Sequence, residues 1–386
     1  MTSEVFSASL LLKVASSIQH VTVPMAKLQA DLKVLMYLHT QGRFMFLIPW
    51  TSRNKSWMRV LGIIIACALA PIAYKLLTLR LYYFTRLPIT CLVMDMSNFL
   101  TSYIFLSYFC IKQNRYINNW LKIQTLLLRT EVLLTTINFS LRSYIFFPKF
   151  ALLHILFFII HSSQLLYWYL SNEMNLALSY IMFRVIHYWT SFATIVILEW
   201  LEVLRRRYDH VNKYIKQLLL SRIGVVHQIC HQLRIVTEIY SNLDEIIHEL
   251  NTVFSYHLFF LIITSILMTL HGLSFAMVMF YTLGSSVTAL AYVSAFFANI
   301  LVLVLGYERL RKKIQNNIKT CLMLQEELAQ GQLRREIGFM IKIMKKFQPK
   351  MSAIGFFEMD FQLISGYVSI VFTYLIIILQ FNLTFK

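Results

Sequence analysis

Between Val253 and Leu305 the chain reads VFSYHLFFLIITSILMTLHGLSFAMVMFYTLGSSVTALAYVSAFFANILVLVL, with no Asp, Glu, Lys or Arg. A helix needs roughly 20 apolar residues to cross the hydrocarbon core of a bilayer. The stretch is therefore long enough for two crossings, at 253–277 and 279–305. The connection near 271–280 carries no Lys or Arg, so the pattern predicts two successive transmembrane helices joined by a short hairpin.

The whole chain shares this apolar character. Of its 386 residues, 58% are hydrophobic and 14% are charged, against roughly 45–50% and 25% in soluble domains. This composition excludes a soluble globular protein, and the low count of 10 Gly and 6 Pro excludes disordered and collagen-like chains. The predicted fold class is all-α, a polytopic membrane protein with seven transmembrane helices. Its five further spans are 58–79, 89–111, 149–170, 174–200 and 357–382.

The position of the basic residues predicts the orientation of these helices. Most of the 36 Lys and Arg residues precede the first span or lie in 112–149, 203–252 and 306–352. Because cytosolic loops carry the excess of Lys and Arg, we expect an inverted topology with the N-terminus cytosolic and the C-terminus extracellular. Since the basic residues lie between apolar runs, the net charge of +18 indicates a lipid bilayer and no nucleic acid as partner.

A heptad pattern organises the cytosolic part. From Leu201 to Val253, apolar residues recur at alternating spacings of three and four, which predicts helices that extend the neighbouring spans and pack along a seam. A turn near Ser221–Gly224 would make them a hairpin. A similar stripe at Leu310, Ile314, Ile318 and Leu322 predicts that the next cytosolic segment bundles with it. The predicted organisation is a lead-in at 1–57, transmembrane helices at 58–200, the cytosolic hairpin at 201–252, transmembrane helices at 253–305, a basic cytosolic helical segment at 306–356 and a last transmembrane helix at 357–382.

The last span carries a motif. Thr373 and Tyr374 are followed by five apolar residues, 375–379, and then by Gln380 and Phe381. Thr373, Ile377 and Gln380 also share one helical face, which by periodicity alone suits a contact between helices or a pore lining equally well. The motif Thr-Tyr-(apolar)5-Gln-Phe resembles the C-terminal signature of insect gustatory receptors.

The resemblance implies a ligand-gated cation channel of the plasma membrane that depolarises a sensory neuron when it binds a small-molecule tastant. It implies a homo- or hetero-tetramer with related receptors, in which the seventh helices line the pore and the cytosolic hairpin serves as the anchor. Since hydrophobic constrictions gate by dewetting, the gate would include apolar side chains. The predicted pore and gate residues are Thr373, Tyr374, Ile377, Gln380 and Phe381. At the inner end of this span we favour helix-dipole complementation over cation attraction for Glu358 and Asp360.

Polar and aromatic groups within the spans suggest a ligand pocket. Ionisable residues at membrane depth are usually paired or functional. Arg184 either pairs with Asp95, the simpler interpretation, or faces the ligand. Tyr and Trp also populate membrane interfaces for their own reasons. The candidate pocket residues are Asp95, His161, Gln164, Trp168, Arg184, His187, Tyr281 and Tyr292.

Other classes fit less well. A G-protein-coupled receptor is the alternative, but it requires the opposite orientation. An enzyme needs a nucleophile with its base or a metal set at one depth, and the scattered histidines provide neither, so we expect no enzyme. His227, Cys230 and His231 share a helix face but lack the second ligand pair that structural zinc requires. We expect no metal site and no cofactor.

Overall fold

The computed structural model describes residues 55–84, 89–137, 174–220, 226–278, 283–327, 331–346 and 348–384, with scattered positions between 152 and 170. Helices account for most of the described residues. The elements are α3 (Lys55–Phe84), α4 (Ile89–Lys112), the 3-10 turn η1 (Gln113–Tyr116), α5 (Ile117–Thr136), α7 (Met174–Leu220), α8 (Val226–Val278), α9 (Leu283–Glu327), α10 (Gln332–Lys346), β1 (Ser352–Ala353), β2 (Phe357–Glu358) and α11 (Phe361–Thr384).

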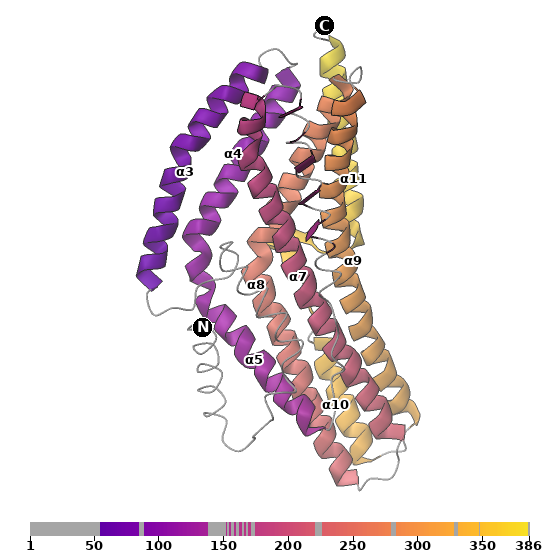
Figure 1. Cartoon of the computed structure of the whole chain (residues 1–386). Coiled ribbons are helices and arrows are strands. Elements are labelled where there is room, and N and C mark those ends of the chain that lie inside the picture. The colour runs from indigo at the N-terminus through magenta and orange to yellow at the C-terminus, as the bar shows by residue number, and fades with distance from the viewer. Residues whose placement is uncertain are drawn as a thin grey trace.

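The helices form two stacked halves (Figure 1). The upper half contains α3, α4 and α11, the lower half contains α5 and α10, and the long helices α7, α8 and α9 run through both. These three have 47, 53 and 45 residues, roughly 70–80 Å at 1.5 Å per residue. That length is more than twice the roughly 30 Å of a hydrocarbon core. One half can therefore cross a membrane while the other projects from it.

Hydropathy assigns the membrane to the upper half. Among the described residues, α3, α4, α8, α9 and α11 are long and apolar enough to cross a bilayer. All charged residues of α8 lie in the first half of the helix, which leaves the stretch after Val253 for the hydrocarbon. They are Arg234, Glu238, Asp244, Glu245 and Glu249. The predicted all-α membrane fold is thus confirmed. α7 covers the predicted fourth span, and most of the predicted span 149–170 lies outside the described residues.

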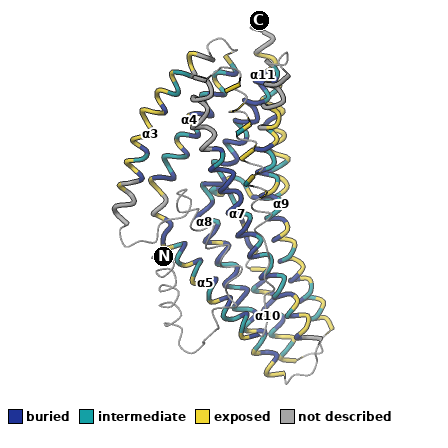
Figure 2. Tube along the Cα trace, viewed as in Figure 1, coloured by how far each residue is buried: buried dark blue, intermediate teal, exposed yellow. Residues whose placement is uncertain are grey.

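The heptad seam is buried within its own chain. Leu204, Tyr208 and Val211 of α7 and Val236 and Leu243 of α8 are all inaccessible to solvent. They belong to one apolar core that also takes in side chains of α5, α9 and α10, and Figure 2 shows buried positions concentrated along α7 and α8. Leu310, Ile314 and Ile318 of the second stripe join this core. The predicted turn at Ser221–Gly224 lies outside the described residues.

A helix that the sequence analysis did not assign lies between the second and third spans. α5 falls in 112–149, which we described only as a basic segment. Its buried residues include Ile117, Trp120, Ile123 and Leu127, at spacings of three or four. A helical period was therefore present in the sequence. Polar contacts add to this packing, since Lys122 Nζ lies 2.6 Å from a Glu245 oxygen and 2.7 Å from a Glu249 oxygen of α8.

A buried ion pair joins α5 to α7. The Arg207 guanidinium Nε donates to Glu131 Oε1 at 2.6 Å, and its Nη1 donates to the Val203 carbonyl at 2.9 Å. The two side chains are only 1% and 4% exposed. Because a buried charge must be paired and hydrogen-bonded, each member of the pair depends on the other.

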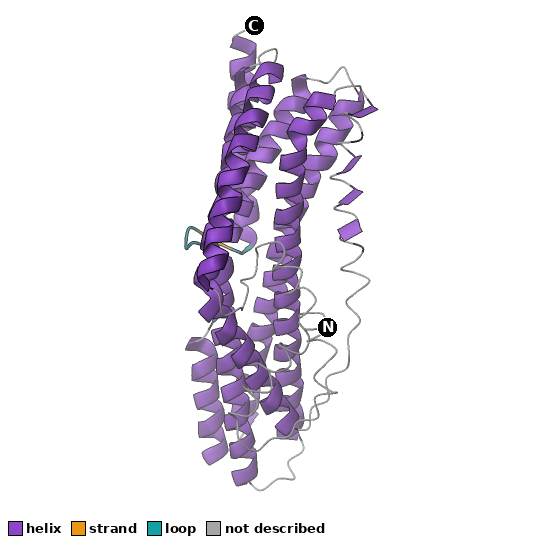
Figure 3. Cartoon of the chain, turned by 60° about the vertical axis from the view of Figure 1, so that its left-hand side comes forward, coloured by secondary structure: helices purple, strands orange, loops and turns teal. Residues whose placement is uncertain are grey.

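A small hairpin separates the two halves before the last helix. Strands β1 and β2 pair antiparallel, with Ala353 opposite Phe357, and the turn between them contains Ile354 at φ 54° and Gly355 at φ 77°. Figure 3 shows the hairpin at mid-height, beside the long helices. Since glycine adopts positive φ without steric cost, Gly355 suits this turn. The hairpin takes up residues that we had assigned to the start of the last span.

Candidate functional site

α11 begins with a capping carboxylate. Asp360 Oδ1 accepts the backbone N–H groups of Gln362 and Leu363 at 3.0 and 3.2 Å. A carboxylate in this position satisfies the free N–H groups of the first turn and complements the helix dipole. Asp360 thus caps α11 as the predicted dipole role requires, whereas the same prediction for Glu358 is wrong, because Glu358 lies in β2 before the helix.

Above this cap, α11 touches the rest of the chain along one narrow line. Its neighbours are chiefly α8 and α9, and most of its remaining surface is exposed, as the yellow segments in Figure 2 show. The buried residues of α11 are Leu363, Tyr367, Val371 and Ile378. In a single copy of the chain, the rest of the helix is therefore open to lipid, to ions or to another subunit.

The predicted gate residues lie on this open surface. The exposed fractions of Tyr374, Ile377 and Phe381 are 48%, 39% and 53%, and Thr373 and Gln380 are also exposed. The Thr373 hydroxyl donates to the Ser369 carbonyl of its own helix at 2.9 Å. The five predicted gate residues are thus exposed in the C-terminal half of α11, whereas Ile378, an apolar residue within the motif, is buried in the core.

A group of polar side chains is buried between α4 and α8 in the membrane half. His271 Nε2 lies 3.6 Å from Asp95 Oδ1, and Cys91 Sγ lies 3.0 Å from Ser274 Oγ. Asn98, one turn beyond Asp95, donates to the Met268 sulfur. Asp95, Asn98 and Ser274 are completely buried, so α4 and α8 enclose a polar site within an apolar bundle. We call Cys91, Asp95, Asn98, His271 and Ser274 the polar cluster.

Only part of the predicted pocket falls within the described residues. Asp95 belongs to the polar cluster, and the buried His187 of α7 packs against Phe296 of α9 with nearly perpendicular rings, whose centroids lie 4.9 Å apart. The backbones of Arg184 and Tyr292 lie in α7 and α9, but their side chains are outside the described part. His161, Gln164, Trp168 and Tyr281 lie outside the described residues. The pairing of Asp95 with Arg184 therefore stays a prediction.

His271 is a site residue that the sequence analysis missed. The predicted span 253–277 contains His271, but we also placed the connection between the spans near 271–280, whereas α8 continues to Val278. His271 therefore lies inside the helix, facing α4. The missed signal was an ionisable residue within a predicted span, in an otherwise apolar run.

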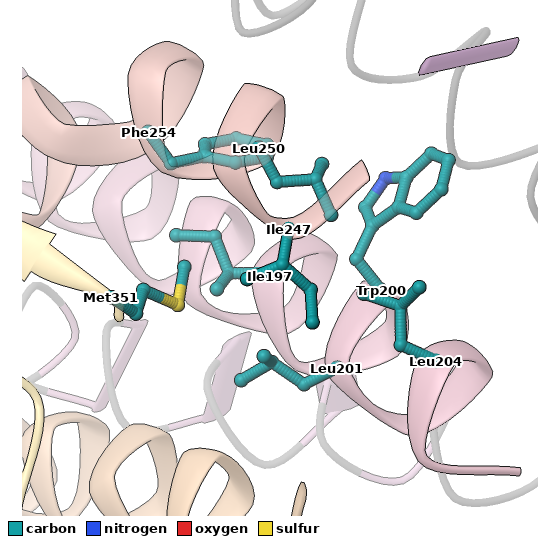
Figure 4. Close-up of a pocket in the computed structure, with 8 residues that line it drawn as sticks. All are labelled: Ile197, Trp200, Leu201, Leu204, Ile247, Leu250, Phe254 and Met351. Carbon is teal, nitrogen blue, oxygen red and sulfur yellow. The ribbon is translucent and has the colours of Figure 1, made fainter. Parts of the chain in front are cut away.

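The cavity in Figure 4 is separate from the polar cluster. Figure 4 shows an apolar lining with side chains from α7, from α8 and from Met351 before β1. The cavity holds about 10 Å³, room for roughly one water molecule. It is too small for an organic ligand. The lining residues are Ile197, Trp200, Leu201, Leu204, Ile247, Leu250, Phe254 and Met351.

Comparison with known protein families identifies a family of membrane receptors for this chain. The 7tm Chemosensory receptor family matches residues 35–385. The chain belongs to this family. Seven spans are thus expected of this receptor, and its family is one of receptors rather than of enzymes. No curated protein matches its sequence.

Solved structures give the same fold for the receptor. It is similar to the insect olfactory receptor OR5 from Machilis hrabei in complex with eugenol, with 13% identity and a TM-score of 0.53 over 92% of this chain and 99% of that one. It is also similar to a second structure of the insect olfactory receptor OR5 from Machilis hrabei, with 13% identity and a TM-score of 0.54 over 90% of this chain and 98% of that one. At this identity the likeness concerns the fold.

Proposed function

We propose that this chemosensory receptor is a gustatory receptor of the plasma membrane that works as a ligand-gated cation channel. A small-molecule tastant would open it and depolarise a sensory neuron. The observation that carries the proposal is the exposed face in the C-terminal half of α11, on which the Thr-Tyr and Gln-Phe residues of the motif are exposed while Ile378 packs in the core. The motif favours a gustatory over an olfactory receptor.

A central pore would explain why the exposed face of the apolar helix α11 carries polar side chains. Four copies, identical or from related receptors, would place their α11 helices around one axis. Ile377 and Phe381 then form a hydrophobic constriction that closes by dewetting, and Gln380 supplies a polar ring for ions. Thr373 and Tyr374 lie one to two turns further in.

The polar cluster and the residues around it are our candidate for the tastant site. Buried apolar walls supply affinity, and a few polar groups fix orientation. Asp95, His187 and His271 are the described candidates, and Arg184 and Tyr292 lie on neighbouring helices. This combination suits a small neutral or weakly basic molecule. We propose His161, Gln164, Trp168 and Tyr281 as further members of the pocket.

Replacing Gln380 with alanine should alter ion permeation. Loss of the polar ring should change the single-channel conductance of tastant-evoked currents at least twofold, since ions would cross the constriction without polar groups to replace their water. The measurement is patch-clamp recording during application of a tastant panel. Gln362→Ala, an exposed glutamine at the inner end of the same helix, is the matched control. Equal conductance in wild type and Gln380→Ala would contradict the pore assignment.

Epitope tags test the proposed orientation. On intact cells, a tag after Lys386 should be reached by antibody, and a tag before Met1 should be reached only after permeabilisation. The excess of Lys and Arg on one side of the membrane is the physical reason. The reversed staining pattern would instead support the G-protein-coupled alternative.

A further inference from the structure

Tyr367 is the polar member of the buried line along α11. Its side chain is 3% exposed, and its ring packs on Phe297 of α9, with centroids 5.8 Å apart. Its hydroxyl lies 2.5 Å from Thr269 Oγ1 of α8 and donates to the Ser265 carbonyl at 3.1 Å. Since the Tyr367 proton points to Ser265, the Thr269 hydroxyl donates to the Tyr367 oxygen. One residue thus joins α11 to both of its neighbouring helices.

The same part of α8 contacts the polar cluster on its other side. Thr269 and His271 are two residues apart, which is roughly 200° around a helix. Thr269 therefore faces α11 while His271 faces Asp95 of α4. A shift or rotation of this turn of α8 changes both contacts at once. α8 is the physical connection between the proposed tastant site and the proposed pore helix.

The location of Tyr367 suits control of the gate. It lies ten residues before Ile377, roughly 15 Å along the helix, and α11 beyond it is largely exposed. A hydrogen bond in an apolar setting has no competing water, and a hydroxyl that loses its partner there is costly. The contact therefore favours one position of α11 against α8 over all others.

We propose that Tyr367, held by Thr269 and Ser265, is the positioning residue that keeps α11 in the closed state. Weakening its hydrogen bonds opens the pore in the absence of ligand. This inference rests on the proposed channel function. It adds a specific contact between α8 and α11 through which events at the polar cluster reach the gate.

The test measures ligand-free current at matched surface expression. Tyr367→Phe removes the hydroxyl and keeps the ring, and Thr269→Val removes the partner and keeps the shape. Each should raise the sodium current without tastant by about twofold to tenfold, the equilibrium change that one lost hydrogen bond produces. The double variant should add little to Tyr367→Phe, because that variant already removes the hydrogen bond to Thr269. Thr269→Ser, which keeps the hydroxyl, should stay at the wild-type level.

A buried threonine elsewhere on α8 provides the control. The Thr264 hydroxyl has no hydrogen-bond partner within the described part of the chain, so Thr264→Val should leave the ligand-free current unchanged. Wild-type current in surface-expressed Tyr367→Phe and Thr269→Val would overturn the inference. A matching rise in Thr269→Ser or Thr264→Val would also overturn it, since general loosening of α8 would then be the cause.

A second variant separates this inference from the channel proposal. When Gln380→Ala is added to Tyr367→Phe, the raised current should change its single-channel conductance. If the single-channel conductance of the raised current is the same with and without Gln380→Ala, the assignment of α11 to the pore is overturned, and the inference with it. An unchanged current in Tyr367→Phe, together with a Gln380→Ala effect on tastant-evoked currents, would overturn the role of Tyr367 alone.

Discussion

Replacing Glu131 with alanine is expected to destabilise the receptor by about 3–5 kcal/mol, because it leaves the Arg207 guanidinium buried without its counter-charge. Arg207 is 1% exposed, and its hydrogen bond to the Val203 carbonyl does not neutralise it. The lower half should loosen where α5 meets α7. The measurements are the thermal unfolding temperature of detergent-solubilised receptor and the fraction that reaches the cell surface, both of which should fall sharply.

An exposed ion pair in the same half provides the control. Lys213 lies 3.0 Å from Asp209 one turn away on α7, and its side chain is 58% exposed. Lys213→Ala should therefore change stability by less than about 1 kcal/mol. Replacing both Glu131 and Arg207 with methionine should recover most of the loss, because no unpaired charge then remains. A Glu131→Ala receptor that unfolds no earlier than Lys213→Ala would show that the pair does not hold the two helices together.

The ion pair also shows which parts of the fold could be predicted from sequence. Periodicity depends on neighbouring residues, so the apolar spans and the seam from Leu201 to Val253 were visible before the structure was known. α5 obeys the same rule and could have been identified from Trp120, Ile123 and Leu127. By contrast, Arg205–Arg207 is a run of three arginines near the start of the predicted cytosolic hairpin. Nothing local distinguishes the buried Arg207 from its two neighbours.

The polar cluster could not be predicted for a similar reason. Its partners come from α4 and α8, which lie far apart in the sequence, and pairing across helices depends on their rotation and depth. The sequence indicated that Asp95 needed a partner, and Arg184 was the nearest candidate by charge. The structure brings His271 to 3.6 Å from Asp95, while the pairing with Arg184 stays a prediction. Charge complementarity predicts that a pair exists, whereas helix packing decides which residues form it.

Helix packing is tested most directly at Gly62 in α3. A Cβ atom at this position would lie 2.0 Å from the Cys110 carbonyl oxygen of α4 and 2.8 Å from its carbon. Both are backbone atoms that cannot rotate away. Gly62→Ala should therefore separate α3 from α4, at an expected cost of about 1–3 kcal/mol or more for overpacking. Alanine favours a helix over glycine by about 1 kcal/mol, so a net fall in unfolding temperature would mean that the steric clash outweighs helix propensity.

The same substitution at a second helical glycine gives the opposite expectation. No described atom lies within 4 Å of a Cβ built on Gly366 of α11, so Gly366→Ala should leave the unfolding temperature unchanged or raise it. The displacement of α3 should also reach the membrane core, because Ala73 of α3 packs in one cluster with Phe99 of α4 and Met268 of α8. Phe99 follows Asn98 in the sequence, so Gly62→Ala should weaken tastant responses as well as stability. If Gly62→Ala and Gly366→Ala behaved alike, the close approach of α3 to α4 would not exist in the membrane.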